Sequence, residues 1–161
     1  MIRQRLEQKL AFRVAGVKTW ISGQHNEEFA DFWKVCTVDG TCGKLKSISS
    51  QPADNVTHSR IMGISRVEND PNNRAFYFYI AAETDTADGF DGFRIDGGEW
   101  AIFEGDGNDA MALIRAEMEA FMHWLPSSGY VHDNRPEIEV YPDGTDVYVE
   151  FWLPVRKNSP Q

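Results

Sequence analysis

One order of elements, strand, helix, strand, strand, occurs twice along this chain of 161 residues. In the first copy, apolar periodicity predicts a strand over 10–20, a helix over 26–36 and strands over 60–67 and 74–83, with a turn at 68–73. The helix is indicated by bulky or apolar side chains at helical spacing, namely Phe29, Phe32, Trp33 and Cys36. Each sheet needs its helix to cover one face, so the repeated order predicts an α+β fold.

The second copy follows a connector over 86–98 that is rich in Gly and Asp. A strand is predicted over 99–107, a helix over 108–125 and two further strands over 136–144 and 147–155. We expect the helix to pack on its sheet through an apolar stripe at helical spacing, made of Met111, Ile114, Met118, Phe121 and Leu125. The two copies share this pattern rather than residue identity.

A length of 161 residues suits one domain. We therefore predict a single domain over 1–161, with pseudo-repeat halves at about 8–85 and 97–156. Its sheets are expected to be antiparallel, with helices on one face. Two such units side by side would leave a ligand groove between the halves, formed by the uncovered faces of their sheets.

The last two predicted strands place unusual side chains on one face. Neighbours two apart in a strand share a face, so we expect one face to pack under the second helix through Ile138, Val140, Phe151 and Leu153. The other face then carries carboxylates among aromatic rings, from Glu139, Tyr141, Glu150 and Trp152. In the first half, Tyr77 and Tyr79 alternate with apolar residues in the same way. Aromatic walls with a carboxylate suit a flat, cationic, amphipathic molecule, because ring faces attract cations and the acid supplies the counter-charge.

The net charge of −9 comes from 16 Lys and Arg against 25 Asp and Glu, without a basic run. Such a field repels phosphate backbones, so direct nucleic-acid binding is not expected. The apolar runs are shorter than the roughly 20 residues that cross a bilayer, and the N-terminal segment lacks the apolar core of a signal peptide. We expect a soluble, cytoplasmic protein, in which Cys36 and Cys42 are free thiols.

The sequence implies no metal and no cofactor. The segment EGDGND lacks later ligands of a calcium loop. The four histidines are scattered along the chain, without the pairwise spacing or the Cys partners of a zinc site. They are His25, His58, His123 and His132. Gly105 and Gly107 precede a helix, but the Lys and the Ser or Thr of a phosphate-binding loop do not follow them.

Four segments between residues 97 and 155 form an ordered set, GGEWAIFEGDG, WLPSSGY, PEIEVYPDG and VEFWLPV. They resemble the Gly-aromatic-Ala-Val-Phe strand, the Trp-Leu-Pro element, the Glu-x-Tyr element and the closing hydrophobic-Pro-Val element of the GyrI-like small-molecule-binding domain. This domain is also the effector-binding half of multidrug-responsive bacterial transcription regulators. In the first half, the family's layout is matched by RVAGVKT, FADFWKV and RIMGIS, with Gly63 where a strand Gly is common.

The resemblance implies a duplicated fold with a ligand pocket between its halves. In such domains the Glu of the Glu-x-Tyr element is a buried acid that faces the ligand, which corresponds here to Glu139, with Tyr141 beside it. Glu150 is the second candidate acid. The aromatic candidates for the pocket are Trp33, Tyr77, Tyr79, Trp100 and Trp152. The alternative for the rings is packing in the core, and for Glu139 it is an exposed strand position beside a basic residue.

Three functions are compatible with the resemblance. The first is a stand-alone domain that binds amphipathic small molecules, which we expect to be cationic. It would either sequester them or act as a sensor for a separate regulator, since we expect no DNA-binding unit ahead of the first strand. The second is hydrolysis of strained electrophilic natural products, as in some family members, with Glu139 orienting or deprotonating a water. The third is a protein-interaction role such as inhibition of DNA gyrase, to which the family's name refers.

Overall fold

A computed structural model describes residues 2–22, 27–66 and 76–158. Within this part of the chain, antiparallel pairing joins nine strands into one sheet of order β1-β6-β9-β8-β3-β4-β2-β5, and β7 pairs with β9. The strands are β1 (Gln4–Lys9), β2 (Phe12–Ile21), β3 (Ser59–Arg66), β4 (Phe76–Glu83), β5 (Asp91–Ile95), β6 (Gly98–Glu104), β7 (Tyr130–His132), β8 (Glu137–Pro142) and β9 (Glu150–Lys157). The predicted α+β class with antiparallel pairing is confirmed.

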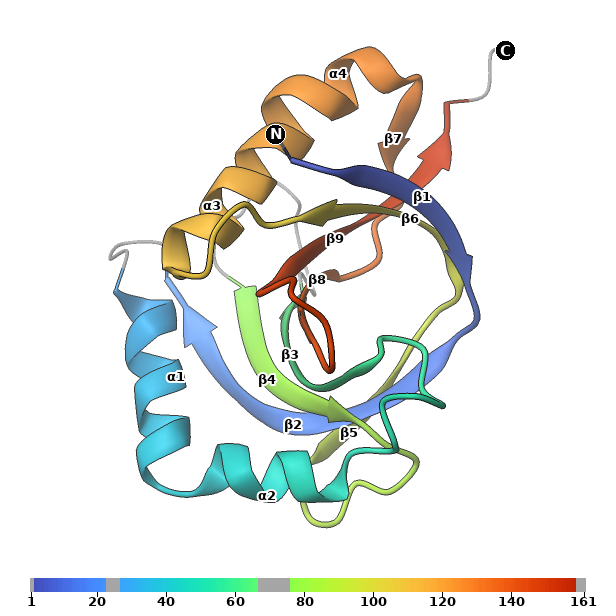
Figure 1. Ribbon diagram of the computed structural model, residues 1–161. Coiled ribbons are helices and arrows are strands. Elements are labelled where there is room, and N and C mark those ends of the chain that lie inside the picture. The colour runs from blue at the N-terminus through green and yellow to red at the C-terminus, as the bar shows by residue number, and fades with distance from the viewer. Residues whose placement is uncertain (1, 23–26, 67–75, 159–161) are drawn as a thin grey trace.

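The helices lie on the outside of the curled sheet (Figure 1). In the first half they are α1 (Glu28–Val38) and α2 (Thr41–Ile48), and in the second half α3 (Ala110–Met118) continues through the π-helical segment η1 (Glu119–Trp124) into α4 (Leu125–Ser128). Four elements had not been predicted, β1, α2, β5 and β7, and β5 lies inside the segment interpreted as a connector. The predicted turn at 68–73 lies outside the described residues.

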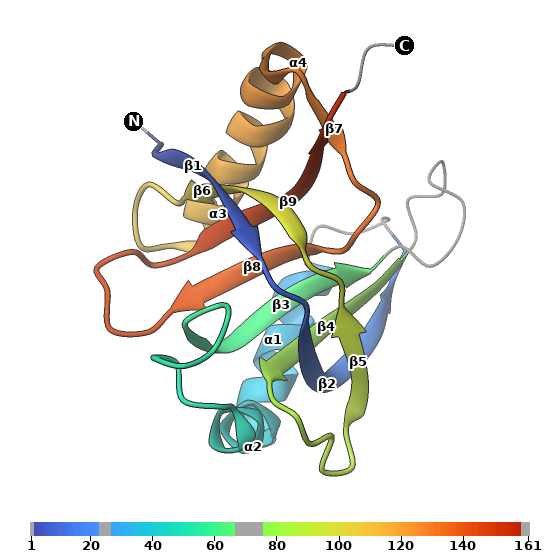
Figure 2. The ribbon, with the colours of Figure 1, turned by 90° about the vertical axis from the view of Figure 1, so that its right-hand side faces the viewer.

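The two halves meet where β3 pairs with β8, so their strands form one continuous sheet rather than two separate sheets (Figure 2). At this seam Gly63 lies directly opposite Glu139. The seam joins strands that are far apart in the sequence, and it places the helices of both halves on the same side of the sheet.

The face of the sheet that carries no helix is filled by apolar side chains. Its core cluster consists of Phe12, Val14, Met62, Ile64, Tyr79, Ala81, Ile95, Trp100, Ile102, Ile138, Val140 and Trp152. The expectation that the uncovered faces form a ligand groove is therefore wrong, because the sheet curls until these faces pack on each other. Ile138 and Val140 were expected to pack beneath the second helix. They belong instead to this core on the other face of the sheet.

Helix α3 meets the sheet through small residues. Ala112, Ala116 and the η1 residue Ala120 are fully buried, whereas four residues of the predicted apolar stripe are 39–50 % exposed, namely Met111, Ile114, Met118 and Phe121. For Met111, Ile114 and Met118 the packing prediction was wrong, because a row of alanines lets the helix lie close to the strands. Phe121 does contact the sheet, since its ring centroid lies 5.8 Å from that of Phe151 in β9. Among the predicted partners, Phe151 and Leu153 do pack beneath the helix.

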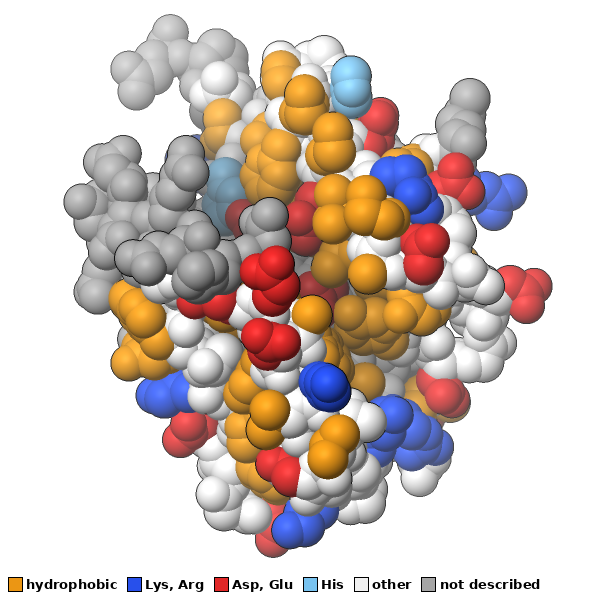
Figure 3. Space-filling model, turned by 90° about the vertical axis from the view of Figure 1, so that its left-hand side faces the viewer, with side chains coloured by type: hydrophobic (Ala, Val, Ile, Leu, Met, Phe, Trp, Pro, Cys, Tyr) orange, Lys and Arg blue, Asp and Glu red, His pale blue; other side chains and the backbone are white. Residues whose placement is uncertain are grey.

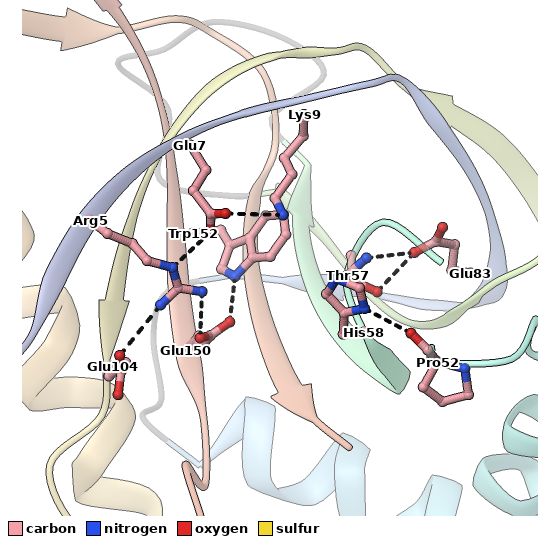
Figure 4. Close-up of polar contacts among 10 residues, drawn as sticks. All are labelled: Arg5, Glu7, Lys9, Pro52, Thr57, His58, Glu83, Glu104, Glu150 and Trp152. Atoms are coloured by element: carbon pink, nitrogen blue, oxygen red, sulfur yellow. Dashed lines mark hydrogen bonds and ion pairs between the residues drawn. The ribbon is translucent and has the colours of Figure 1, made fainter. Parts of the chain in front are cut away.

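A buried carboxylate fixes the loop that leads into β3. Glu83 accepts a hydrogen bond from the backbone N–H of Val56 at 2.7 Å. It also accepts bonds from the backbone N–H and the hydroxyl of Thr57 at 3.0 and 2.9 Å (Figure 4). These bonds satisfy an acid that is only 7 % exposed, so Glu83 has a structural role.

In the described part of the chain, every helix is too short or too polar to span a membrane.

Candidate functional site

A cleft of about 2180 Å³ opens on the helix-covered side of the sheet, over the seam between the halves. Figure 3 shows apolar side chains around a hollow with acidic side chains inside it. Both halves contribute to its walls, which include Phe29, Trp33, Ile61, Leu113, Glu117, Glu139, Tyr141 and Tyr148. The cleft thus lies between the halves, as predicted, but on the opposite face of the sheet.

Glu139 of β8 is an acid in this cleft that receives hydrogen bonds from two aromatic side chains. Its Oε1 atom accepts a hydrogen bond from Trp33 Nε1 of α1 at 3.1 Å and another from the Tyr141 hydroxyl at 2.9 Å. Both donors use the same oxygen, and none of the described residues donates a hydrogen bond to the second carboxylate oxygen. The Trp33 contact spans 106 positions of sequence and ties the first half to the second.

The absence of a side chain at Gly63 makes room for this carboxylate. A Cβ atom at Gly63 would lie 2.5 Å from both Cγ and Oε1 of Glu139, a distance that real Cβ atoms do not tolerate. The side chain of Glu139 therefore crosses β3 only because its partner across the seam is glycine.

We expect Gly63→Ala to lower the free energy of unfolding by about 1–3 kcal/mol, because the added methyl group overpacks the seam and displaces Glu139 from its two donors. Urea denaturation measures this change. Gly43→Ala is the matched control, since a Cβ atom there meets nothing within 4 Å and the position lies in α2. That control should be neutral or more stable by about 0.4–1 kcal/mol, and equal losses in the two variants would contradict the role given to Gly63.

Burial raises the pKa of Glu139 from 4.5 to about 7, although its bonds to Tyr141 and Trp33 act in the opposite direction. The same desolvation, together with the negative charge of Glu139, raises the pKa of the Tyr141 hydroxyl. Tyr141 therefore stays protonated and donates to the carboxylate. No basic side chain of the described residues forms an ion pair with Glu139.

Glu117 of α3 is a second acid in the cleft that the sequence analysis missed. Burial and the nearby charges of Glu139 and Glu137 raise its pKa from 4.5 to about 8. Within the described part of the chain it also has no basic partner. Helical spacing offered a signal, because Ala110, Leu113 and Glu117 are three and four positions apart and all line the cleft.

The structure brings together three of the eight predicted site residues, Trp33, Glu139 and Tyr141. Trp100, Trp152 and Tyr79 lie in the core on the other face of the sheet, each at most 3 % exposed. Tyr77 packs beside that core, with its ring edge-on to Trp20 at 4.9 Å.

Glu150 also lies on the other face, where it has a structural partner. It accepts hydrogen bonds from Arg5 of β1 at 2.8 Å and from the indole nitrogen of Trp152 at 3.1 Å (Figure 4). These contacts hold the first strand on the sheet. Glu150 and Trp152 lie on the face opposite to Glu139 because of the strand register. Glu139 of β8 lies opposite Phe151 of β9, so the neighbours of Phe151 in β9 point to the other face.

Among the described residues, no group of three or more His, Cys, Asp or Glu side chains has an arrangement that would hold a metal ion.

An open cleft that joins aromatic walls to acids with no basic partner among the described residues is typical of a small-molecule-binding domain. The chain belongs to the family of integron-associated effector-binding proteins called Cass2, whose model matches residues 5–155. This match confirms the resemblance to GyrI-like effector-binding domains. No curated protein sequence matches the chain.

Solved structures share the fold. SAV2435 bound to tetraphenylphosphonium is 21% identical, with a TM-score of 0.80 over 96% of this chain and 94% of that chain. A putative bacterial transcription regulation protein from Staphylococcus aureus is 23% identical, with a TM-score of 0.75 over 96% and 98% of the two chains. An integron cassette protein of Vibrio cholerae is 13% identical, with a TM-score of 0.68 over 95% of each chain.

Proposed function

We propose that this protein binds amphipathic organic cations in the cleft, with Glu139 as the principal counter-charge. The observation that carries the proposal is the Glu139 carboxylate, held by Trp33 and Tyr141 at the bottom of an aromatic cleft without a basic partner among the described residues. A buried charge is normally paired, because desolvation is costly. Here the missing partner is supplied by the ligand.

The walls suit the rest of such a ligand. Phe29, Trp33, Tyr141 and Tyr148 present rings from both halves, and a cation near a ring face gains about 0.5–2 kcal/mol. Glu117 stands on α3 and adds a second negative charge. A bulky cation with aromatic substituents could contact the rings and both acids at once.

The comparisons support the ligand class and leave the biological role to this proposal. SAV2435, which shares the fold, was solved with tetraphenylphosphonium, a cation surrounded by four phenyl groups. We infer that the present chain acts as an effector-binding unit that sequesters such molecules or serves as the sensor of a separate regulator. Hydrolysis and gyrase inhibition, the two alternatives drawn from the sequence, stay predictions.

The proposal is tested with two ligands of nearly equal shape and different charge. Methyltriphenylphosphonium should bind about 10-fold to 100-fold more tightly than triphenylphosphine oxide, because only the cation compensates the acids. Isothermal titration calorimetry measures both affinities. Equal affinities would contradict the counter-charge assigned to Glu139.

The affinity for the cation should also rise with pH. Glu139 and Glu117, with pKa values of about 7 and about 8, are mostly protonated in mild acid and become ionised as the pH passes through this range. The same calorimetric titration of methyltriphenylphosphonium at a series of pH values measures the effect. The neutral oxide is the control, and its affinity should stay nearly constant.

A further inference from the structure

The corner between α1 and α2 holds two cysteines side by side. Cys36 lies in the last turn of α1 and Cys42 in the first turn of α2, and the chain reverses between them at Gly40, whose φ of 86° is left-handed. Both thiols are free and buried, at 2 % and 6 % exposure. Their sulfur atoms are 2.8 Å apart.

We infer that Cys36 and Cys42 are a modification site, at which a small-molecule disulfide such as oxidised glutathione converts the two thiols into a reversible intramolecular disulfide. The bond length of a disulfide is about 2.05 Å, so the sulfur atoms need to approach by less than about 1 Å. The fold already holds the two side chains together, and thus provides most of the orientation that the reaction requires.

The surroundings of the two cysteines indicate which thiol reacts first with the small-molecule disulfide. Cys42 lines the cleft, whereas Cys36 does not contribute to its walls. Burial and the neighbouring Cys42 raise the pKa of the Cys36 thiol to about 12, so Cys36 is a poor first nucleophile. Cys42 is therefore the residue that meets the oxidant, and Cys36 the residue that resolves the intermediate.

The two steps balance as thiol–disulfide exchange. The Cys42 thiolate attacks one sulfur of oxidised glutathione, forms a mixed disulfide and releases one glutathione thiolate, which accepts the proton of the Cys36 thiol. The Cys36 sulfur then attacks Cys42 Sγ and releases the second glutathione. One small disulfide is reduced to two thiols, and one protein disulfide is formed.

The product would fasten α1 to α2 beside the cleft. The Thr37 hydroxyl already joins this corner to the preceding turn, since it lies 2.8 Å from the carbonyl oxygen of Trp33 and 3.7 Å from Cys42 Sγ. Closing the short loop between the cysteines restricts the unfolded chain, so the oxidised protein should melt about 4–8 °C higher than the reduced protein.

The 161-residue chain is equilibrated with reduced and oxidised glutathione at graded ratios, alkylated to block the remaining thiols, and its mass is measured by mass spectrometry. We expect a species two hydrogens lighter than the reduced protein, without alkyl groups. The quantity compared is the ratio of the oxidised glutathione concentration to the square of the reduced glutathione concentration at which half of the protein carries the disulfide. This ratio should be about 10-fold or more lower for the folded protein than for the protein in denaturant, because the fold holds the sulfur atoms together.

Single variants separate the roles of the two thiols. Cys36→Ser should stop at the mixed disulfide with glutathione on Cys42. Cys42→Ser should stay unmodified, because its remaining thiol, Cys36, is buried and does not line the cleft. The comparison of folded and denatured wild-type protein decides the question even if a variant fails to fold. Two alkylated thiols in excess oxidised glutathione, a mixed disulfide that does not resolve, or a disulfide between chains would overturn the inference.

Discussion

Glu139→Gln should weaken binding of methyltriphenylphosphonium by about 10-fold to 100-fold, which corresponds to about 1–3 kcal/mol. The amide keeps the size of the side chain. Its oxygen can still accept the hydrogen bonds that Trp33 and Tyr141 donate to Glu139 Oε1 in the wild-type protein. Only the negative charge is lost. Isothermal titration calorimetry of wild type and variant near pH 9, where both acids are mostly ionised, measures the difference.

Glu150→Gln is the matched control for this experiment. It makes the same chemical change one strand away, but on the other face of the sheet, where Glu150 pairs with Arg5. The control should alter stability and leave the affinity for the cation unchanged. Glu117→Gln should give an intermediate loss, because Glu117 lies in the cleft wall without the two hydrogen-bond donors of Glu139. A larger loss of affinity in Glu150→Gln than in Glu139→Gln would refute the location of the site.

The second large effect concerns the stability of the protein without ligand. The pKa of Glu139 in the folded protein, about 7, lies above its ordinary value of 4.5. A group whose pKa is raised by folding contributes stability that is fully present when the pH is below its pKa in the unfolded chain. This stability is lost as the pH rises through its pKa in the folded protein. Ionised Glu139 therefore destabilises the fold in neutral and alkaline solution, and this cost vanishes in acid.

Glu139→Gln should accordingly be more stable than wild type by about 1–3 kcal/mol near pH 9 and by almost nothing near pH 4, once the shift is discounted for the solvent in the open cleft. Urea denaturation of both proteins at these pH values measures their free energies of unfolding. Taking the difference between the two proteins cancels the contribution of the other titrating groups, which both proteins share.

Glu139→Leu is a useful second variant in this experiment. It also removes the charge, but it deprives Trp33 Nε1 and the Tyr141 hydroxyl of their acceptor. It should therefore be less stable than Glu139→Gln by about 1–3 kcal/mol. A wild-type protein as stable as Glu139→Gln at alkaline pH would show that Glu139 carries no desolvation cost.

Local sequence patterns predicted most of the regular elements. The predicted strand over 10–20 corresponds to β2 (Phe12–Ile21), and the predicted helix over 26–36 to α1 (Glu28–Val38). Periodicity of apolar residues is a property of one segment, so it can be recognised without knowledge of the partners. β5 has no such pattern and becomes a strand because it pairs with the edge of β2.

The sequence by itself determined the fold class, the family, and the pair Glu139 and Tyr141, which share a face because they are two apart in one strand. The tertiary structure decided that Trp33 and Glu117, from two distant helices, line the same cleft as Glu139. It also decided on which face of the sheet this cleft lies. Alternation within one strand shows which of its side chains lie together, but it does not show which strand lies opposite or which face the helices cover. The register that sets Glu139 against Gly63 and Phe151 therefore depends on how the curled sheet and its helices pack.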